Sequence, residues 1–106
     1  MKTIEIQYTK HQEKEVKKTI EAPYYCKVIE DGEYCESIYY YKITPKIVSY
    51  IEFSKDRFET HSYVCLGREI RENYNNWENL FENGEQITKE EFQKAQVKAK
   101  EMNHNL

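Results

Sequence analysis

The residues best suited to nucleophilic or metal chemistry are three cysteines and three histidines: Cys26, Cys35, Cys65, His11, His61 and His104. A thiol nucleophile needs a base within hydrogen-bonding reach. His61 and Cys65 share one predicted strand, but four residues of extended chain separate them by roughly 13 Å at about 3.3 Å per residue. No cysteine pair has the C-x2–4-C spacing of a zinc site, and no H-x-x-x-H occurs. We therefore expect no catalytic residue, no metal and no cofactor. We expect free thiols packed as small core or half-core residues.

Acid–base chemistry by paired carboxylates has one candidate. Glu52 and Glu59 are expected to be cross-strand neighbours, and two close carboxylates can share a proton. On a solvated face such a pair only repels. The three glycines, Gly32, Gly67 and Gly84, cannot build the glycine-rich loops that bind nucleotide phosphates. The sequence therefore predicts a protein that is not an enzyme.

Tyrosine is the unusual residue of this chain, because ten of its 106 residues are Tyr. Tyrosine forms strands well, and it is also frequent in binding interfaces. We predict an exposed aromatic patch on the sheet, made by Tyr40, Tyr50, His61 and Tyr63. A tyrosine-rich sheet face could instead stack single-stranded bases, which is the alternative function.

A second candidate surface is acidic. The net charge of the chain is −3, the opposite sign from a typical duplex-binding domain, so binding of nucleic acid is disfavoured. Residues 67–91 hold seven glutamates against two arginines and one lysine, and they could imitate nucleic-acid phosphates against a basic partner. An ordinary solvated surface is the alternative. The candidate contact residues of this segment are Glu72, Tyr74, Trp77, Glu78 and Glu82.

Two hairpins are expected to form the centre of a sheet. The Asp-Gly dipeptide at positions 31–32 lies between β-rich residues 24–30 and 33–44, which predicts a two-residue turn. That turn pairs Lys27 with Glu36, a match of opposite charges.

The second hairpin is expected to join residues 46–53 to residues 58–65, with Phe53 opposite Phe58. One face then carries the better core candidates, which are Ile47, Ile51, Phe53, Phe58 and Val64. The opposite face is the more polar one, with Val48, Tyr50, Glu52, Glu59, His61 and Tyr63. A slip of one residue would exchange the two faces.

The remaining elements follow from periodicity and capping. Alternation predicts strands over residues 1–8 and 13–21, the second with the lysines of an edge strand. Residues 68–81 have helical spacing but several asparagines, which predicts a short helix or an ordered loop held by Trp77. Thr88 and Glu91 form a capping box that starts a helix ending near position 102. Its buried stripe is Phe92, Ala95, Ala99 and Met102, and Ile87 completes a hydrophobic staple.

These elements predict a single domain over residues 1–106. Its class is α+β: an antiparallel sheet of five or six strands with a C-terminal helix packed on one face. The start of the chain has no apolar block typical of a signal peptide, and no apolar run is long enough to cross a membrane. We therefore expect a cytoplasmic protein with no membrane partner.

The segment Asn83-Gly84-Glu85-Gln86-Ile87-Thr88-Lys89-Glu90-Glu91-Phe92 resembles the ending of many short bacterial and phage-borne proteins. These resemble the chain in size, in a strand-rich front and in an I-T-x-E-E-F helix start. Some small acidic proteins of this kind inhibit host defence, including anti-CRISPR proteins. The resemblance implies a non-enzymatic inhibitor from a phage or mobile element that binds another protein, and it assigns no binding residue. A homodimer through an edge strand stays open.

Overall fold

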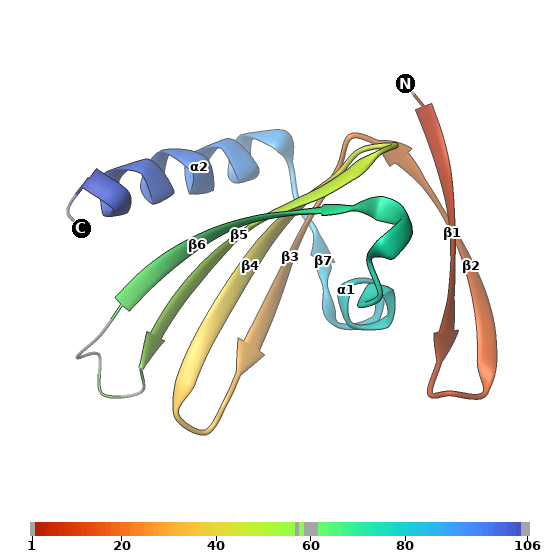
Figure 1. The fold of residues 1–106 in the computed structure, drawn as a ribbon, viewed down its shortest axis with the longest axis horizontal. Helices are drawn as coiled ribbons and strands as arrows, with labels where there is room; N and C mark the ends of the chain where they lie inside the picture. Colours follow the sequence, from red (N-terminus) through yellow and green to blue (C-terminus); the bar gives the residue numbers. More distant parts are fainter. Residues whose placement is uncertain (1, 57, 59–61, 105–106) are drawn as a thin grey trace.

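A five-stranded antiparallel sheet organises the chain, with a helix across one face and a two-stranded ribbon beside it (Figure 1). The computed structural model describes residues 2–56, 58 and 62–104. The elements in chain order are β1 (Lys2–Lys10), β2 (Lys14–Ala22), β3 (Tyr24–Asp31), β4 (Cys35–Ile43), β5 (Ile47–Asp56), β6 (Ser62–Ile70), the 3-10 helix η1 (Arg71–Asn73), α1 (Trp77–Asn83), β7 (Glu85–Gln86) and α2 (Lys89–His104). The predicted α+β class with a C-terminal helix is confirmed. The strand order of the main sheet is β6-β5-β4-β3-β7.

The first two strands form a ribbon of their own rather than extending the main sheet. β1 and β2 pair along their whole length, with Ile4 opposite Ile20. Ile6 and Ala22 lie on the same side, and all four side chains are buried. The ribbon therefore contributes its apolar side to the core instead of joining the backbone ladder of the sheet.

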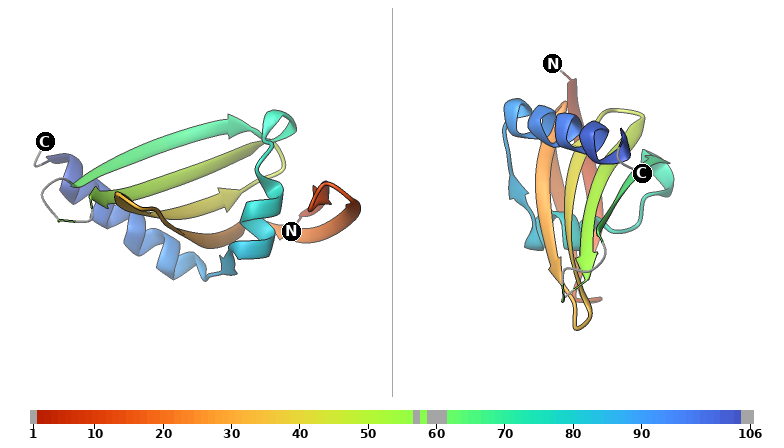
Figure 2. Two further views of the ribbon diagram at one scale, coloured as in Figure 1. Left: turned by 90° about the horizontal axis from the view of Figure 1, so that it is seen from below. Right: turned by 90° about the vertical axis from the view of Figure 1, so that its left-hand side faces the viewer.

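Both faces of the main sheet are packed, which differs from the one-sided core predicted from the sequence. One core lies under α2 and contains Tyr25, Ile51, Ile87, Phe92, Ala95 and Ala99. The larger core is on the opposite face, where the ribbon and α1 meet the sheet, and it contains Ile4, Ile6, Ile20, Ala22, Cys26, Val28, Tyr41, Ile43, Val48, Tyr74, Trp77 and Leu80. Val48, expected on the polar face, is fully buried, and Phe58, expected in the core, is 84% exposed. The prediction for Val48 was wrong because it assumed a cover on one face of the sheet, whereas both faces are covered (Figure 2). Phe58 is exposed because it lies in the turn between β5 and β6.

The first hairpin has a longer loop than the Asp-Gly signal predicts. Lys27 pairs with Tyr40 instead of Glu36, and the last pair before the loop is Asp31 with Glu36. Gly32 does not have the positive φ that the predicted turn requires. The observed register aligns buried side chains, such as Cys26 with Tyr41, because cross-strand packing outweighs a local turn preference.

The register of the second hairpin is also shifted relative to the prediction. Phe53 pairs with Val64, not with Phe58. Both shifts are an even number of residues, so each strand keeps the face assignment that its alternation predicts. The pairing predictions were wrong, but the predicted residues that lie within the described strands are grouped by face as expected; Glu59 and His61 lie outside the described residues.

The helical segments follow their local signals. Residues 71–73 form η1, and α1 begins at Trp77, which is 8% exposed and anchors this part of the chain. At the start of α2, the Glu91 N–H donates to Thr88 Oγ1 across 3.2 Å, as the capping box predicts. Neither described helix combines the length and apolar character needed to span a lipid bilayer.

Candidate binding surfaces

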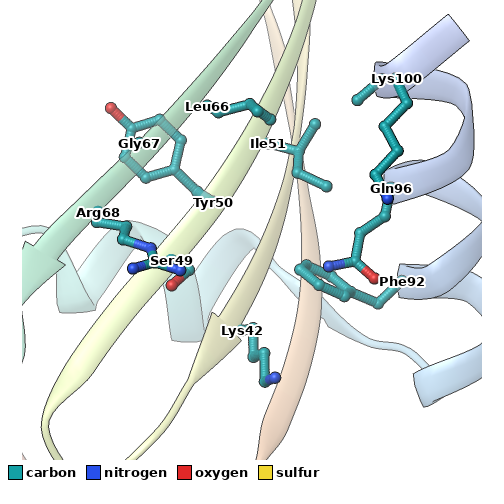
Figure 3. Close-up of a pocket in the computed structure, with 11 residues that line it drawn as sticks. Lys42, Ser49, Tyr50, Ile51, Leu66, Gly67, Arg68, Phe92, Gln96 and Lys100 are labelled. Atoms are coloured by element: carbon teal, nitrogen blue, oxygen red, sulfur yellow. The ribbon is translucent and has the colours of Figure 1, made fainter.

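A groove of about 530 Å³ runs between α2 and the strands β4, β5 and β6. It forms because α2 crosses the strands steeply and covers only part of the sheet face (Figure 2). Ile51, Leu66 and Phe92 give the groove an apolar floor and walls, while Ser49 and Gln96 add uncharged polar groups. Figure 3 shows the strands and the helix approaching this space from opposite sides.

The charge of the groove is opposite to that of the whole chain. Lys42, Arg68 and Lys100 line it, and its lining contains no Asp or Glu. Within the described part of the chain, none of the three makes an ion pair with a carboxylate. Figure 3 shows Lys42 and Arg68 extending from strands and Lys100 from α2. Cations around an apolar floor attract a ligand that carries both negative charge and apolar surface.

Strand β6 forms one border of this groove and is the end strand of the sheet. Among the described residues, no strand lies along its outer edge. Its nine residues include only two charged ones, Arg68 and Glu69, whereas the lysine-rich β2 has five in nine. Leu66 and Ile70 are each 60% exposed on the groove side. We call the outer edge of β6 with Ile47, Leu66 and Ile70 the β6 edge surface.

The predicted aromatic patch is divided between the two faces of the sheet. Tyr40 faces α2, where its ring meets Phe53 edge-on at 5.8 Å. Tyr50 and Tyr63 lie on the opposite face; Tyr50 is half-buried and Tyr63 is 50% exposed. His61 lies outside the described residues. The prediction that these four share one exposed patch is therefore wrong, because Tyr40 has the opposite parity in the pleat.

Two glutamates of the predicted acidic surface, Glu78 and Glu82, make contacts within the molecule. Glu82 accepts a hydrogen bond from the Tyr8 hydroxyl and lies 2.8 Å from Lys10 Nζ. Glu78 accepts from the backbone N–H of His11 at 2.8 Å. These contacts attach the tip of the β1–β2 ribbon to α1. Glu72 is exposed in η1.

The remaining two predicted contact residues of the acidic segment belong to the core. Tyr74 and Trp77 are each 8% exposed, and their ring centroids are 4.5 Å apart. Neither ring is free to form a flat contact surface. The aromatic signal at these positions marks the anchor that fixes η1 and α1 on the sheet.

The pKa shifts at the ribbon tip have a local cause. Bonding to Lys10 and then to Tyr8 lowers the pKa of Glu82. Burial, followed by the hydrogen bond to Glu82, raises the pKa of Tyr8 to about 12. Both groups therefore keep their ordinary charge states at neutral pH, and the contact needs no unusual protonation.

The cysteines are free, as predicted, but only one is in the core. Burial raises the pKa of the Cys26 thiol to about 12, and a thiol held in its neutral form is a poor nucleophile. Cys35 and Cys65 are exposed, so their prediction as core or half-core residues is wrong. Across the described ranges, no three His, Cys, Asp or Glu side chains gather as a metal site would require.

The basic groove was not predicted from the sequence. Its cations come from β4, β6 and α2, and no short motif connects residues so far apart. The signal that could have found part of it is the low charge of residues 62–70, since unguarded edge strands favour pairing with another chain. No family model matches the chain, and neither a curated protein nor a solved structure matches it.

Proposed function

We propose that this protein is a non-enzymatic binding protein that accepts an extended segment of a partner protein as an added strand on β6. The observation that supports this proposal is the open nine-residue edge with two charged residues and two large apolar side chains each 60% exposed. Strand addition uses the unpaired backbone groups of such an edge for affinity and neighbouring pockets for specificity.

The basic groove defines the chemistry of the partner segment. Side chains of an added strand alternate between the two sheet faces, so every second one would lie beside Leu66 and Arg68. Leu66 favours an apolar neighbour, and Arg68 favours a carboxylate. Lys42 and Lys100 extend the positive charge along the groove. On the groove side, the segment expected here therefore carries an apolar residue and an acidic residue two positions apart.

The narrower form of the proposal is an inhibitor of host defence from a phage or mobile element, acting in the cytoplasm in the manner of anti-CRISPR proteins. The resemblance of residues 83–92 supports this form, and an inhibitor that works by occupying a surface needs only the binding surface described above. Phage plating on a host with an active CRISPR system tests it. Unchanged plating efficiency on expression of the chain would remove this form while leaving strand addition intact.

The competing function is binding of single-stranded nucleic acid by the tyrosines. Stacking needs rings with a free face, and most of the rings here pack on one another, for example Tyr39 on Tyr41 at 5.9 Å. A labelled oligonucleotide that binds at low micromolar concentration would nevertheless favour nucleic acid over a protein partner.

Panning of a random peptide library tests the proposal. Wild-type protein should enrich peptides that carry an apolar residue and an acidic residue two positions apart. A double variant, Leu66→Lys with Ile70→Lys, should lose them, because lysines on an edge oppose strand pairing. Val97→Lys is the matched control, since Val97 is 57% exposed on α2 and does not line the groove. Equal enrichment by the double variant would contradict docking on β6.

The charge of the groove is tested separately. Replacing Lys42, Arg68 and Lys100 by Glu should weaken the enriched peptides by about tenfold or more, and added salt should weaken their binding to the wild type. Lys94→Glu changes the charge of α2 by the same amount per residue outside the groove and should have little effect. Enriched peptides that carry no net negative charge would refute the role of the groove but leave strand addition on β6 standing.

A further inference from the structure

A second pocket, of about 230 Å³, lies on the face of the sheet opposite the basic groove. Four tyrosines line it, two from β4, one from β5 and one from the segment after η1; they are Tyr39, Tyr41, Tyr50 and Tyr74. Glu30 and Glu69 contribute the charged groups of the lining, and no lysine or arginine lines it. We call these six residues the tyrosine cup.

The rings of the cup meet in two ways: Tyr39 and Tyr41 are stacked at 5.9 Å and 15°, whereas the other ring pairs are tilted or edge-on. Tyr41 and Tyr50 have centroids 5.9 Å apart at 46°, and Tyr41 meets Tyr74 at 6.2 Å and 70°. The tilted pairs leave a small open volume beside the rings. The sheet fixes this arrangement, because Tyr41 and Tyr50 are directly opposite in the β4–β5 register.

The position of the Tyr50 ring in the tyrosine cup depends on Gly67. Gly67 is opposite Tyr50 in the register of β5 and β6, and a Cβ atom at this position would come within 2.1 Å of Tyr50 Cζ. Only glycine leaves room for the Tyr50 ring to lie across the backbone of β6. The single glycine of β6 therefore serves the cup and not a turn.

The electrostatic surroundings of the rings are negative. Burial raises the pKa of Tyr74 to about 12; the Tyr41 hydroxyl beside it lowers this pKa, and the carboxylates of Glu69 and Glu30 make smaller contributions that raise it. Burial, followed by the charges of Glu52 and Glu30, also raises the pKa of Tyr39. The phenols therefore stay neutral at physiological pH, and each keeps a π face of negative potential in a negative field.

We propose that the tyrosine cup binds an alkylated ammonium cation. Neutral aromatic faces attract an organic cation within about 6 Å of the ring centroid, and the attraction increases when water is excluded. The carboxylates at the rim add Coulomb attraction without requiring the cation to lose its alkyl contacts. Glu69 is exposed, and one oxygen of Glu30 accepts from Asn79 at 2.9 Å, which holds that carboxylate at the rim.

This site and the groove lie on opposite faces of the sheet but are neighbours, because Glu69 belongs to β6 and Tyr50 lines both pockets. The alkylammonium group could be a free small molecule or a methylated lysine of a protein. Choline represents the free small molecule, and N-acetyl-trimethyllysine amide represents the methylated lysine. The compound that binds more tightly identifies the source.

Titration of isotope-labelled protein with choline, followed by the amide signals of Asn75 and Asn76 at the pocket, tests the site. Choline should bind at least about tenfold more tightly than 3,3-dimethylbutan-1-ol, its uncharged isostere, because only the charge differs. Equal affinities for the two compounds, or the absence of saturable shifts with both choline and the trimethyllysine amide, would overturn the proposal.

Variants separate a cation site from a merely apolar hollow. Glu69→Gln removes a rim charge at an exposed position and should weaken choline severalfold while leaving the fold intact. Tyr39→Leu should weaken it further, whereas Tyr39→Phe keeps the π face and should retain most of the affinity. Tyr34→Leu is the control, since Tyr34 is 77% exposed in the first hairpin loop and outside the cup. Glu69→Gln binding choline as tightly as the wild type would contradict the role assigned to the rim charge.

Discussion

Single residues decide which side chains of this chain are available for chemistry and which are structural. Cys26 is 1% exposed in the larger core, opposite Tyr41, so its thiol serves packing. Sequence reasoning set aside a catalytic pair of His61 and Cys65 on spacing alone, and His61 lies outside the described residues. That reasoning could not separate Cys26 from the exposed Cys35 and Cys65, because all three occur in similar strand-like surroundings and only the tertiary packing distinguishes them.

The raised pKa of Cys26 predicts a loss of stability in alkali. An unfolded thiol loses its proton near pH 9, whereas the folded thiol holds its proton up to about pH 12. The stabilising difference is complete below pH 9 and decreases as the pH rises above it, so the free energy of unfolding should fall by about 1–2 kcal/mol between pH 8 and pH 10 from this group. Urea unfolding at both pH values measures the change.

The control for this prediction is Cys26→Ala, which retains the exposed thiols and every tyrosine. Its stability should decrease less than that of the wild type between the same two pH values, whatever its stability at pH 8. An equal decrease in both proteins would show that another group causes the alkaline sensitivity.

At the scale of helices and strands, local signals such as a helix cap could be read from the sequence, but the pairing of strands could not. The capping box at Thr88 and the anchoring role of Trp77 depend on a few neighbouring residues, and both predictions hold. The register of the first hairpin depends on which side chains are buried by β1, β2 and α1. Those elements are distant in sequence, so the Asp-Gly dipeptide could not determine the pairing.

Trp77 provides the test at this scale. Trp77→Ala should reduce the free energy of unfolding by about 3–5 kcal/mol, because it leaves a cavity beneath α1 and removes the ring that Tyr74 and Phe81 contact. Circular dichroism during urea unfolding measures the loss without relying on tryptophan fluorescence.

Val97→Ala is the matched change at an exposed apolar position and should alter stability by less than about 0.5 kcal/mol. A Trp77→Ala variant as stable as this control would show that Trp77 is not the anchor of η1 and α1.

At the scale of the whole molecule, the two faces of one sheet carry opposite charge and different packing. The face under α2 leaves a basic, apolar groove beside the open edge of β6, and the other face holds the acidic tyrosine cup. Neither site could be predicted as a unit, because each is assembled from several strands and a later segment. The sequence did indicate two of the components, which are the abundant tyrosine and the glutamates of residues 67–91.

The account depends most on strand addition at β6, and hydrogen exchange of β6 tests it most directly. Amide exchange is measured for the free protein and for its complex with an acidic peptide enriched by panning. Strand addition predicts that outward-facing amides within Ser62–Ile70 become strongly protected in the complex, while those of β1 and β2 change little. Protection confined to another element, with the β6 amides exchanging as in the free protein, would contradict the account.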